Sequence, residues 1–198
     1  MTRRYCGRVG AAFVAADGRV ARVRGEVARG RVVTRVLLVT GARSLADDPA
    51  AEAWARGLIA EALAGVGLLI VGDAPGPDAW ASRIQRNAMR RVWCYRTRGP
   101  NAGWIDTAHC EEWDRLRLWS TGVSAHPLDR NAAMVDAAAA MRDAGVDVRV
   151  LALLDGRKPR VVQPGEDRPT RGTEHTVGLA EDAGLTVDAR VWPKGATT

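Results

Sequence analysis

Glycine-containing turns that directly follow short apolar runs carry residue types able to bind phosphate. The first such turn reads VTGARS and contains Gly41 and Arg43. A glycine lets the backbone approach a ligand closely or adopt positive φ, and an arginine can pair with a phosphate through two N–H groups. The G-x-G-x-x-G and G-x-x-x-x-G-K-[ST] patterns of dinucleotide and P-loop sites are both absent. A plain tight turn with a surface arginine is the alternative interpretation of this stretch.

The second turn lies in LLIVGDAPGPDAWAS, where backbone freedom is combined with a helix start. Gly72 ends the apolar run, Gly76 frees the backbone, and Pro77 suits the first position of a helix. Asp78 then falls in the first helical turn, where its charge favours the helix dipole. Helix initiation alone explains this pattern. The alternative is a backbone cradle for an anion, with Asp78 binding a sugar hydroxyl, because a carboxylate does not itself bind phosphate.

Two later stretches place polar residues at expected helix starts. In HPLDRNAAM, Asp129 is expected to be the N-cap, with Arg130 and Asn131 at the start of the helix. In TRGTEHT, Gly172 and Thr173 open a helix, and the Thr173 hydroxyl can cap that helix or bind a phosphate. The four turns favour a ligand site more strongly together than any one of them does alone.

Strand-like and helix-like segments alternate from residue 36 onward. Apolar runs or alternation predict strands at 36–39, 68–71, 92–95, 146–154 and 186–192. Helical patterns predict helices at 49–64, 77–89, 131–144 and 173–183, and the polar segments 96–126 and 156–171 are expected to be mostly loop. This alternation predicts an α/β fold, a Rossmann-like doubly wound parallel sheet of about five strands. Ligands bind beyond the carboxyl ends of such strands, where the four turns fall.

Positive charge is concentrated in the N-terminal segment. Residues 1–31 contain eight arginines and two acidic residues, so their net charge of +6 equals that of the whole 198-residue chain. Residues 34–198, the predicted Rossmann-like domain, are therefore not expected to bind nucleic acid through their overall charge. We expect residues 1–33 to form a basic extension or a hairpin that turns at Asp17 and Gly18. Contact of this arm with nucleic acid or another acidic partner is the alternative.

Cysteine usage and hydropathy argue against several classes of protein. The three cysteines, Cys6, Cys94 and Cys110, are scattered and show no C-x-x-C or Cys/His spacing. They predict neither a disulfide scaffold nor a metal site, and no cofactor is expected. No apolar run is long enough for a membrane span or a secretory leader. A cytoplasmic protein that does not enter a membrane is therefore expected.

Four stretches together resemble a known superfamily. RVLLVTGAR, VGDAPGPDAWA, RNAAM and GTEHTVGLAEDAGLTV occur in this order between about residues 35 and 191. They are similar to the pattern of the YspA-like branch of the SLOG superfamily, which includes the DprA/SMF and LOG (Lonely Guy) proteins. Trp113 and Gly122 resemble loop positions of that pattern, whereas residues 1–34 have no counterpart in it.

The resemblance implies a Rossmann-like fold that binds a nucleotide or a nucleotide-derived small molecule. It also implies a sensor role in stress or phage-conflict systems. Relatives on this fold often form dimers, so a homodimer is expected by analogy. The ligand-binding positions that the resemblance implies are Gly41, Arg43, Gly72, Gly76, Asp78, Arg130, Asn131, Gly172 and Thr173.

Hydrolysis of an N-glycosidic or phosphoester bond, as in LOG proteins, is the alternative function. LOG proteins share a P-G-G-x-G-T-x-x-E pattern, whose closing Glu acts in bond cleavage. Here Thr176 occupies the position of that Glu, Glu174 lies elsewhere on the expected helix, and no P-G-G precedes Gly172. These departures argue against LOG-type hydrolysis. The acid and base candidates of an enzyme would be Asp78, Glu174 and Glu111.

Overall fold

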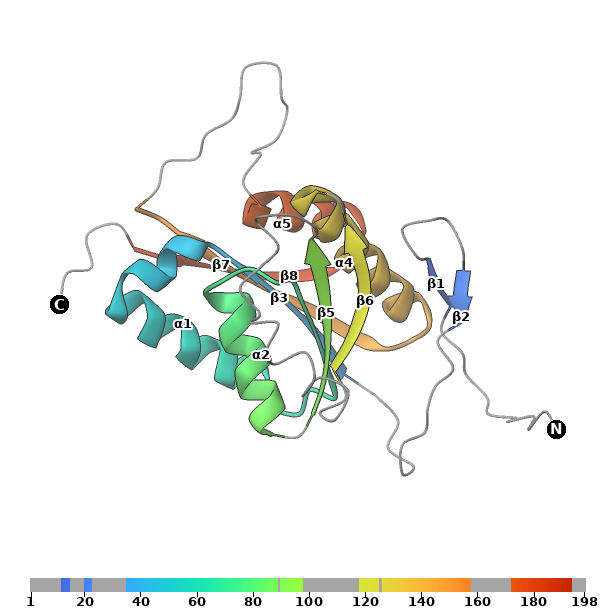
Figure 1. Ribbon diagram of the computed structural model, residues 1–198, viewed down its shortest axis with the longest axis horizontal. Helices are drawn as coiled ribbons and strands as arrows, with labels where there is room; N and C mark the ends of the chain where they lie inside the picture. Colours follow the sequence, from blue (N-terminus) through green and yellow to red (C-terminus); the bar gives the residue numbers. More distant parts are fainter. Residues whose placement is uncertain are drawn as a thin grey trace, which may run out of the picture.

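A parallel β-sheet of six strands forms the centre of the molecule (Figure 1). The computed structural model describes residues 12–14, 20–22, 35–88, 90–97, 118–124, 126–157 and 172–193. The strand order is β6-β5-β4-β3-β7-β8, and all neighbouring strands are parallel. The strands are β3 (Arg35–Gly41), β4 (Leu68–Val71), β5 (Arg91–Thr97), β6 (Leu118–Ser124), β7 (Asp147–Asp155) and β8 (Thr186–Trp192). The predicted α/β, Rossmann-like fold class is confirmed.

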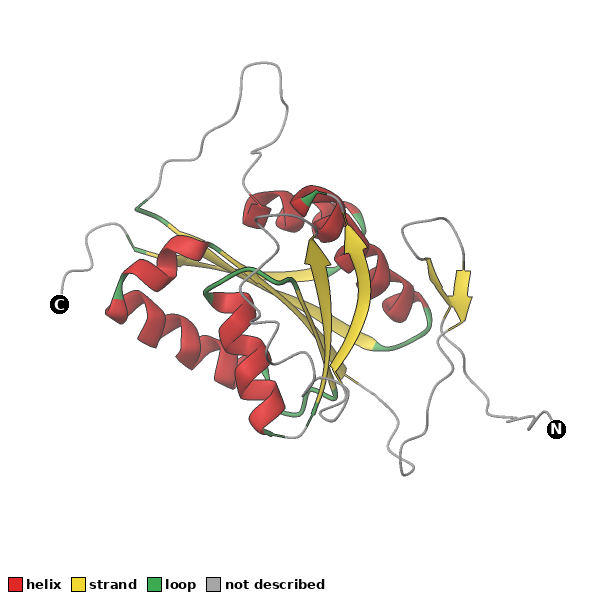
Figure 2. Cartoon of the chain, viewed as in Figure 1, coloured by secondary structure: helices red, strands yellow, loops and turns green. Residues whose placement is uncertain are grey.

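Helices cover both faces of this sheet (Figure 2). One face carries α1 (Pro49–Ala62) and α2 (Pro77–Asn87), and the other carries α4 (Pro127–Asp143) and α5 (Gly172–Asp182). A short 3-10 helix, η2 (Arg43–Asp47), joins β3 to α1. The helices α1, α2 and α4 begin with a proline, whose fixed φ suits a helix and whose missing N–H is not needed there.

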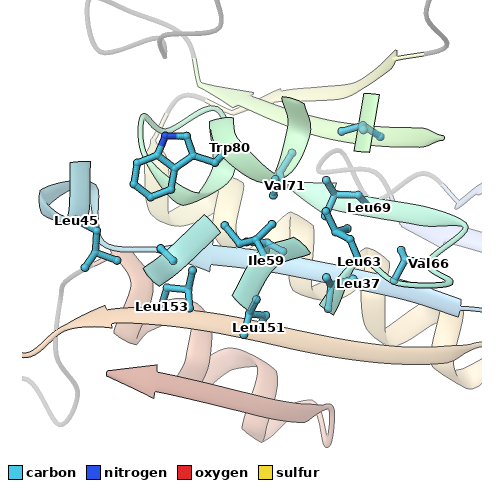
Figure 3. Close-up of a cluster of buried hydrophobic side chains, with 14 of the residues drawn as sticks. Leu37, Leu45, Ile59, Leu63, Val66, Leu69, Val71, Trp80, Leu151 and Leu153 are labelled. Carbon is cyan, nitrogen blue, oxygen red and sulfur yellow. The ribbon is translucent and has the colours of Figure 1, made fainter. Parts of the chain in front are cut away.

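Successive residues of β3 alternate between two hydrophobic cores. Leu37 and Val39 pack with α1 and α2 (Figure 3), whereas Val36 and Leu38 pack with α4 and α5. Alternate residues of a strand point to opposite faces, so a sheet covered on both faces needs apolar residues at every position. This requirement explains why continuous apolar runs predicted β3 and β4 correctly.

The strand β6 lies within residues 96–126, which were predicted to be mostly loop, and the structure corrects that prediction. It pairs in parallel with β5, with Val92 opposite Leu118 and Trp93 opposite Trp119. β6 is an edge strand, so its hydrogen bonds to β5 define it rather than a continuous apolar run, which its sequence LWSTGVS lacks. Gly122, which was expected in a loop, lies in this strand.

Helix α4 begins at Pro127, four residues earlier than predicted. His126 rather than Asp129 is its N-cap, and the His126 Nδ1 accepts a hydrogen bond of 3.2 Å from the Leu128 N–H. The extended backbone of His126 and the proline that follows it favour this start. Asp129 lies instead in the first turn, where its charge favours the helix dipole.

The sheet reverses its winding direction between β3 and β7. From β3, the strands β4, β5 and β6 add outward on one side, whereas β7 and β8 lie on the other side of β3. Ligand sites in open α/β sheets lie beyond the carboxyl ends of the strands, near such a reversal. A ligand site is therefore expected at the carboxyl ends of β3, β4 and β7.

Two further strands lie outside the main sheet. β1 (Ala12–Val14) and β2 (Val20–Arg22) pair in antiparallel fashion, with Val14 opposite Val20. This pairing agrees with the expected N-terminal hairpin, although Asp17 and Gly18 lie outside the described residues. Within the described ranges, none of the helices combines the length and the apolar character needed to cross a bilayer.

Candidate ligand-binding site

Two groups of polar side chains lie at the carboxyl edge of the sheet. The first, here called the Asp78 cluster, joins the end of β4 to the starts of three helices and consists of Gly72, Asp73, Asp78, Arg130, Asn131 and Gly172. The second, here called the Arg157 cluster, lies between the ends of β3 and β7 and consists of Ser44, Asp48, Asp155 and Arg157. Most of the predicted ligand positions lie in or beside the first cluster.

A buried ion pair holds the Asp78 cluster together. The Arg130 guanidinium donates to the carboxylate of Asp73, and both side chains are buried. Arg130 also donates from Nε and Nη2 to the Asn131 side-chain oxygen, at 3.1 and 2.8 Å. The Asn131 amide then donates to the Gly172 carbonyl at 2.9 Å. The start of α4 is thereby tied to the end of β4 and to the start of α5.

Asp78 is buried beside this ion pair with incomplete hydrogen bonding. Its side chain lies on the first turn of α2, and the residue is only 4% exposed. Oδ2 accepts a long hydrogen bond of 3.4 Å from the Ala74 N–H, and Oδ1 has no hydrogen-bond partner. Burial raises the pKa of Asp78 to about 6, against the opposing effects of Arg130 and the Ala74 N–H. A carboxylate in this setting is suited to accept a hydrogen bond from a ligand.

Gly72 allows the two charged side chains to meet above the end of β4. A Cβ on Gly72 would lie 2.6 Å from the Asp78 Oδ2 and 2.8 Å from the Arg130 Cζ. The Gly72 carbonyl accepts a hydrogen bond of 3.4 Å from the Cys94 thiol. The absence of a side chain at residue 72 therefore serves contacts within the protein.

The predicted residues Gly41, Gly76 and Arg43 come together where β3 ends and α2 begins. A Cβ on Gly41 would lie 2.6 Å from the Pro77 Cβ, so this glycine lets α2 pack onto the end of β3. Gly76 has φ of 87°, and a Cβ there would lie 3.6 Å from the Arg43 carbonyl oxygen. Arg43 itself is exposed. Two successive strand–helix turns of the chain thus lie side by side.

The helix starts at this edge differ in how their first N–H groups are satisfied. Asp48 caps α1 through hydrogen bonds of 2.9 and 3.2 Å, and His126 caps α4. Gly76 before α2 and Ala42 before η2 provide no side-chain cap. Uncapped N–H groups together with a helix dipole form an anion site. The start of α2, beside Arg43, is therefore the part of the edge best suited to a phosphate.

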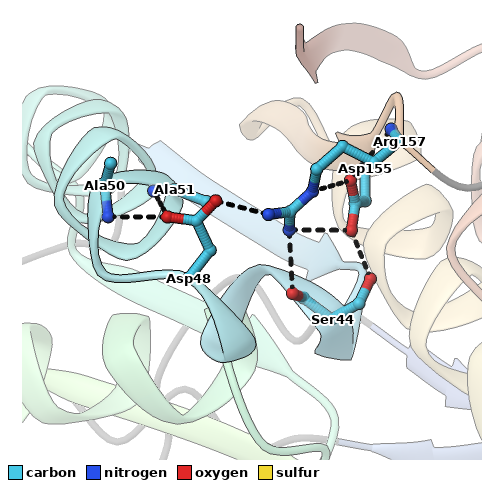
Figure 4. Close-up of polar contacts among 6 residues, drawn as sticks. All are labelled: Ser44, Asp48, Ala50, Ala51, Asp155 and Arg157. Atoms are coloured by element: carbon cyan, nitrogen blue, oxygen red, sulfur yellow. Dashed lines mark hydrogen bonds and ion pairs between the residues drawn. The ribbon is translucent and has the colours of Figure 1, made fainter. Parts of the chain in front are cut away.

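The Arg157 cluster, by contrast, satisfies its own charges (Figure 4). Arg157 donates to Asp155, to the carboxylate of Asp48 and to the Ser44 carbonyl. The Ser44 hydroxyl donates to Asp155 at 2.6 Å. The hydrogen bond from Arg157 is the main cause that lowers the pKa of Asp155 to about 2, and Ser44 adds to the effect. This cluster links the end of β7 to η2 and to the start of α1.

The start of α5 lacks the acidic group of LOG-type hydrolases. Thr173 is buried in the first turn, and the buried Thr176 donates its hydroxyl to the Gly172 carbonyl at 2.8 Å. Thr176 thus stabilises the helix start and has no acid or base to offer there. Glu174 is half-buried on the same helix, and Glu111 and Trp113 lie outside the described residues. Among the residues that the structure describes, no three His, Cys, Asp or Glu side chains are grouped to hold a metal ion.

Sequence reasoning missed Asp73 and the whole Arg157 cluster. Asp73 directly follows Gly72 at the end of an apolar run, and Asp155 ends the run of β7. An acidic residue at the carboxyl end of a predicted strand was therefore an available signal. Arg130 is 57 positions away from Asp73, and Ser44 is 111 positions away from Asp155. Only the folded sheet brings those partners together.

Comparison with known proteins gives a similarity of structure but none of sequence. No protein-family model and no curated protein sequence matches the chain. The structure is similar to the crystal structure of DNA processing protein A (DprA) from Streptococcus pneumoniae, with a TM-score of 0.48 and 14% sequence identity. The match covers 78% of this chain and 50% of the DprA chain, so it spans half the length of that protein. By its own strand order and layers, the chain belongs to the Rossmann-like α/β class.

Proposed function

We propose that this protein binds a nucleotide or a nucleotide-derived small molecule at the carboxyl edge of its sheet. The observation that carries the proposal is the buried Asp78 carboxylate, whose Oδ1 has no hydrogen-bond partner. A buried polar atom without a partner costs about 1–3 kcal/mol. A ligand that donates a hydrogen bond to this oxygen would remove that cost.

The neighbouring groups suit the other parts of a nucleotide. The uncapped start of α2 offers backbone N–H groups to a phosphate, and the exposed Arg43 can pair with the same group. Asp78 can accept a hydrogen bond from a ribose hydroxyl or from an N–H of the base. The proposed site therefore has a phosphate end at Arg43 and a donor-binding end at Asp78.

The resemblance to the SLOG superfamily supports the same proposal. The positions that carry the resemblance include Arg43, Asp78 and Arg130, which lie at this edge. The electrostatic influence of both arginines on Asp78 shows that the three charges are close. The finer assignment to the YspA-like branch, with a sensor role in stress or phage-conflict systems, is part of the proposal.

A thermal-shift screen tests the proposed site. Wild-type protein is heated with AMP, IMP, NAD, ADP-ribose or cyclic dinucleotides, and a ligand at a hundred times its Kd adds about 2.7 kcal/mol of apparent stability. We expect at least one compound to raise the Tm of the wild type and to raise that of Arg43→Gln less. Arg83→Gln is the matched control, because Arg83 is exposed on α2 beyond its first turn. Equal shifts in Arg43→Gln and Arg83→Gln, or no shift with any compound, would contradict the proposal.

A further inference from the structure

The Asp78 cluster contains more buried negative than positive charge. Asp73 and Asp78 are buried carboxylates, and Arg130 is the buried cation between them. Arg130 directs its hydrogen bonds to Asp73 and to Asn131. Asp78 therefore receives charge stabilisation from Arg130 at longer range and a hydrogen bond from the Ala74 N–H, while Oδ1 stays without a partner.

We propose that Asp78 couples ligand binding at this edge to the release of a proton, because the hydrogen bond that a ligand donates to its unpartnered Oδ1 is stronger when the side chain is a carboxylate than when it is a neutral acid. This inference rests on the proposed function and adds a chemical requirement to it. The ligand must present a neutral hydrogen-bond donor, an O–H or an N–H, to Oδ1. When it binds, the carboxyl proton leaves to solvent, and no covalent bond of the ligand forms or breaks.

The groups that face Asp78 determine the direction of this coupling. Burial disfavours the charged form most strongly, and the neighbouring Asp73 after β4 acts in the same direction. Arg130 on α4, the Ala74 N–H and Arg43 on η2 favour the charged form. Their balance leaves the pKa of Asp78 at about 6. A ligand donor at Oδ1 adds another group that favours the charged form, so binding lowers this pKa.

The sign of the pH dependence follows from that shift. Below about pH 6 the free protein carries a proton on Asp78, and the ligand binds less tightly until that proton is lost. The affinity is therefore expected to rise about tenfold between about pH 5 and about pH 7 and to level off above that. A phosphate placed closer to Asp78 than the donor would have the opposite effect, because a second negative charge raises the pKa of a carboxyl group.

Isothermal titration calorimetry with the full chain tests the inference. ADP-ribose and NAD are the probes, because neither carries a phosphate monoester, whose own second pKa near 6 would imitate the effect. Titrations in two buffers of different ionisation enthalpy count the protons. We expect binding of at least one probe to strengthen about tenfold between about pH 5 and about pH 7 and to release a proton near pH 6. Asp78→Asn should abolish the pH dependence.

Asp129→Asn is the matched control, because Asp129 is an exposed carboxylate on the first turn of a helix at the same edge. This variant should keep the wild-type pH dependence. The analogue of NAD that lacks the base amine, and 2′-deoxy-ADP-ribose, show whether the donor is an N–H or an O–H. Wild-type binding that is independent of pH, or that takes up a proton, overturns the inference and leaves the proposed function intact. No binding of either probe at any pH overturns the inference, and the proposed function is overturned as well only if AMP, IMP and the cyclic dinucleotides also fail to bind.

Discussion

Any side chain at residue 72 would collide with the Asp78 cluster. In Gly72→Ala the new Cβ would lie 2.6 Å from the Asp78 Oδ2 and 2.8 Å from the Arg130 Cζ. Neither group can move freely, because both are buried and Arg130 is paired with Asp73. We expect Gly72→Ala to lower the free energy of unfolding by about 1–3 kcal/mol. Equilibrium denaturation in urea measures this change.

Gly57→Ala provides the comparison for that measurement. Gly57 lies inside α1, and a Cβ there meets nothing within 4 Å. This substitution should raise the free energy of unfolding by about 0.5–1 kcal/mol, because alanine loses less conformational entropy in a helix. If the two variants behave alike, the close approach of Asp78 and Arg130 over residue 72 is not a constraint on the fold.

Single residues were predictable where the signal was local. Asp78 follows a Gly-Pro turn at a helix start, and that local pattern was sufficient to single it out. The glycines Gly41 and Gly72 were singled out as ligand positions, and the structure shows that they allow contacts with Pro77 and within the Asp78 cluster. The burial of Asp73 and its pairing with Arg130 depend on the packing of α4 against the sheet, which no local pattern encodes.

At the scale of elements, Arg157 connects the end of β7 to the start of α1. It pairs with Asp155 and with Asp48, which caps α1. Arg157→Met should lower the free energy of unfolding at neutral pH, since the hydrogen bond from Arg157 is the main cause that holds the pKa of Asp155 at about 2 rather than 3.8. A depressed carboxyl pKa stabilises the fold above about pH 4, and this contribution disappears as the pH falls to about 2. The difference between variant and wild type should shrink over the same range.

Arg190→Met serves as the control for Arg157→Met. Arg190 and Asp188 form an ion pair on the neighbouring strand β8, but both side chains are 54% exposed. Exposed pairs contribute little to stability, so this variant should unfold like the wild type across the pH range. Denaturation curves at several pH values separate the two cases. A loss in Arg157→Met that does not change with pH would mean that its cause is lost packing rather than the charge on Asp155.

Strands were predictable where the sequence shows an apolar run or an alternation, and the mostly exposed strand β8 was predicted from its alternation. β3 and β4 were evident because both of their faces lie against helices and their buried stretches 36–39 and 68–71 are apolar throughout. β6 was missed because an edge strand is held by its hydrogen bonds to β5, and its sequence lacks an apolar run. The first turn of α4 was missed because its polar residues suggested a cap at Asp129, whereas His126 takes that role.

At the scale of the whole molecule, one part of the carboxyl edge is occupied by contacts within the protein and another part is open to a ligand. Between the ends of β3 and β7, each guanidinium nitrogen of Arg157 donates a hydrogen bond to a protein oxygen. The uncapped start of α2 and the unpartnered Asp78 oxygen lie near the end of β4 instead. A ligand at this edge is therefore expected beside β3 and β4 rather than at the reversal point itself, where many α/β proteins bind theirs.

Removal of the basic arm, residues 1–33, would distinguish binding of a nucleotide by the Rossmann-like domain from binding of nucleic acid by the arm. The main sheet begins at Arg35, and both hydrophobic cores are built from residues beyond that point. A chain of residues 34–198 is therefore expected to keep the Tm of the full chain and any shift caused by a nucleotide.

The arm carries a net charge equal to that of the whole chain, so its loss leaves the remainder neutral overall. If the alternative holds and the arm contacts nucleic acid, binding of single-stranded DNA by the full chain, measured by fluorescence anisotropy, weakens steeply with salt and is absent from residues 34–198. DNA binding that survives the deletion would assign it to the Rossmann-like domain, and a lowered Tm would show that the arm is part of the fold.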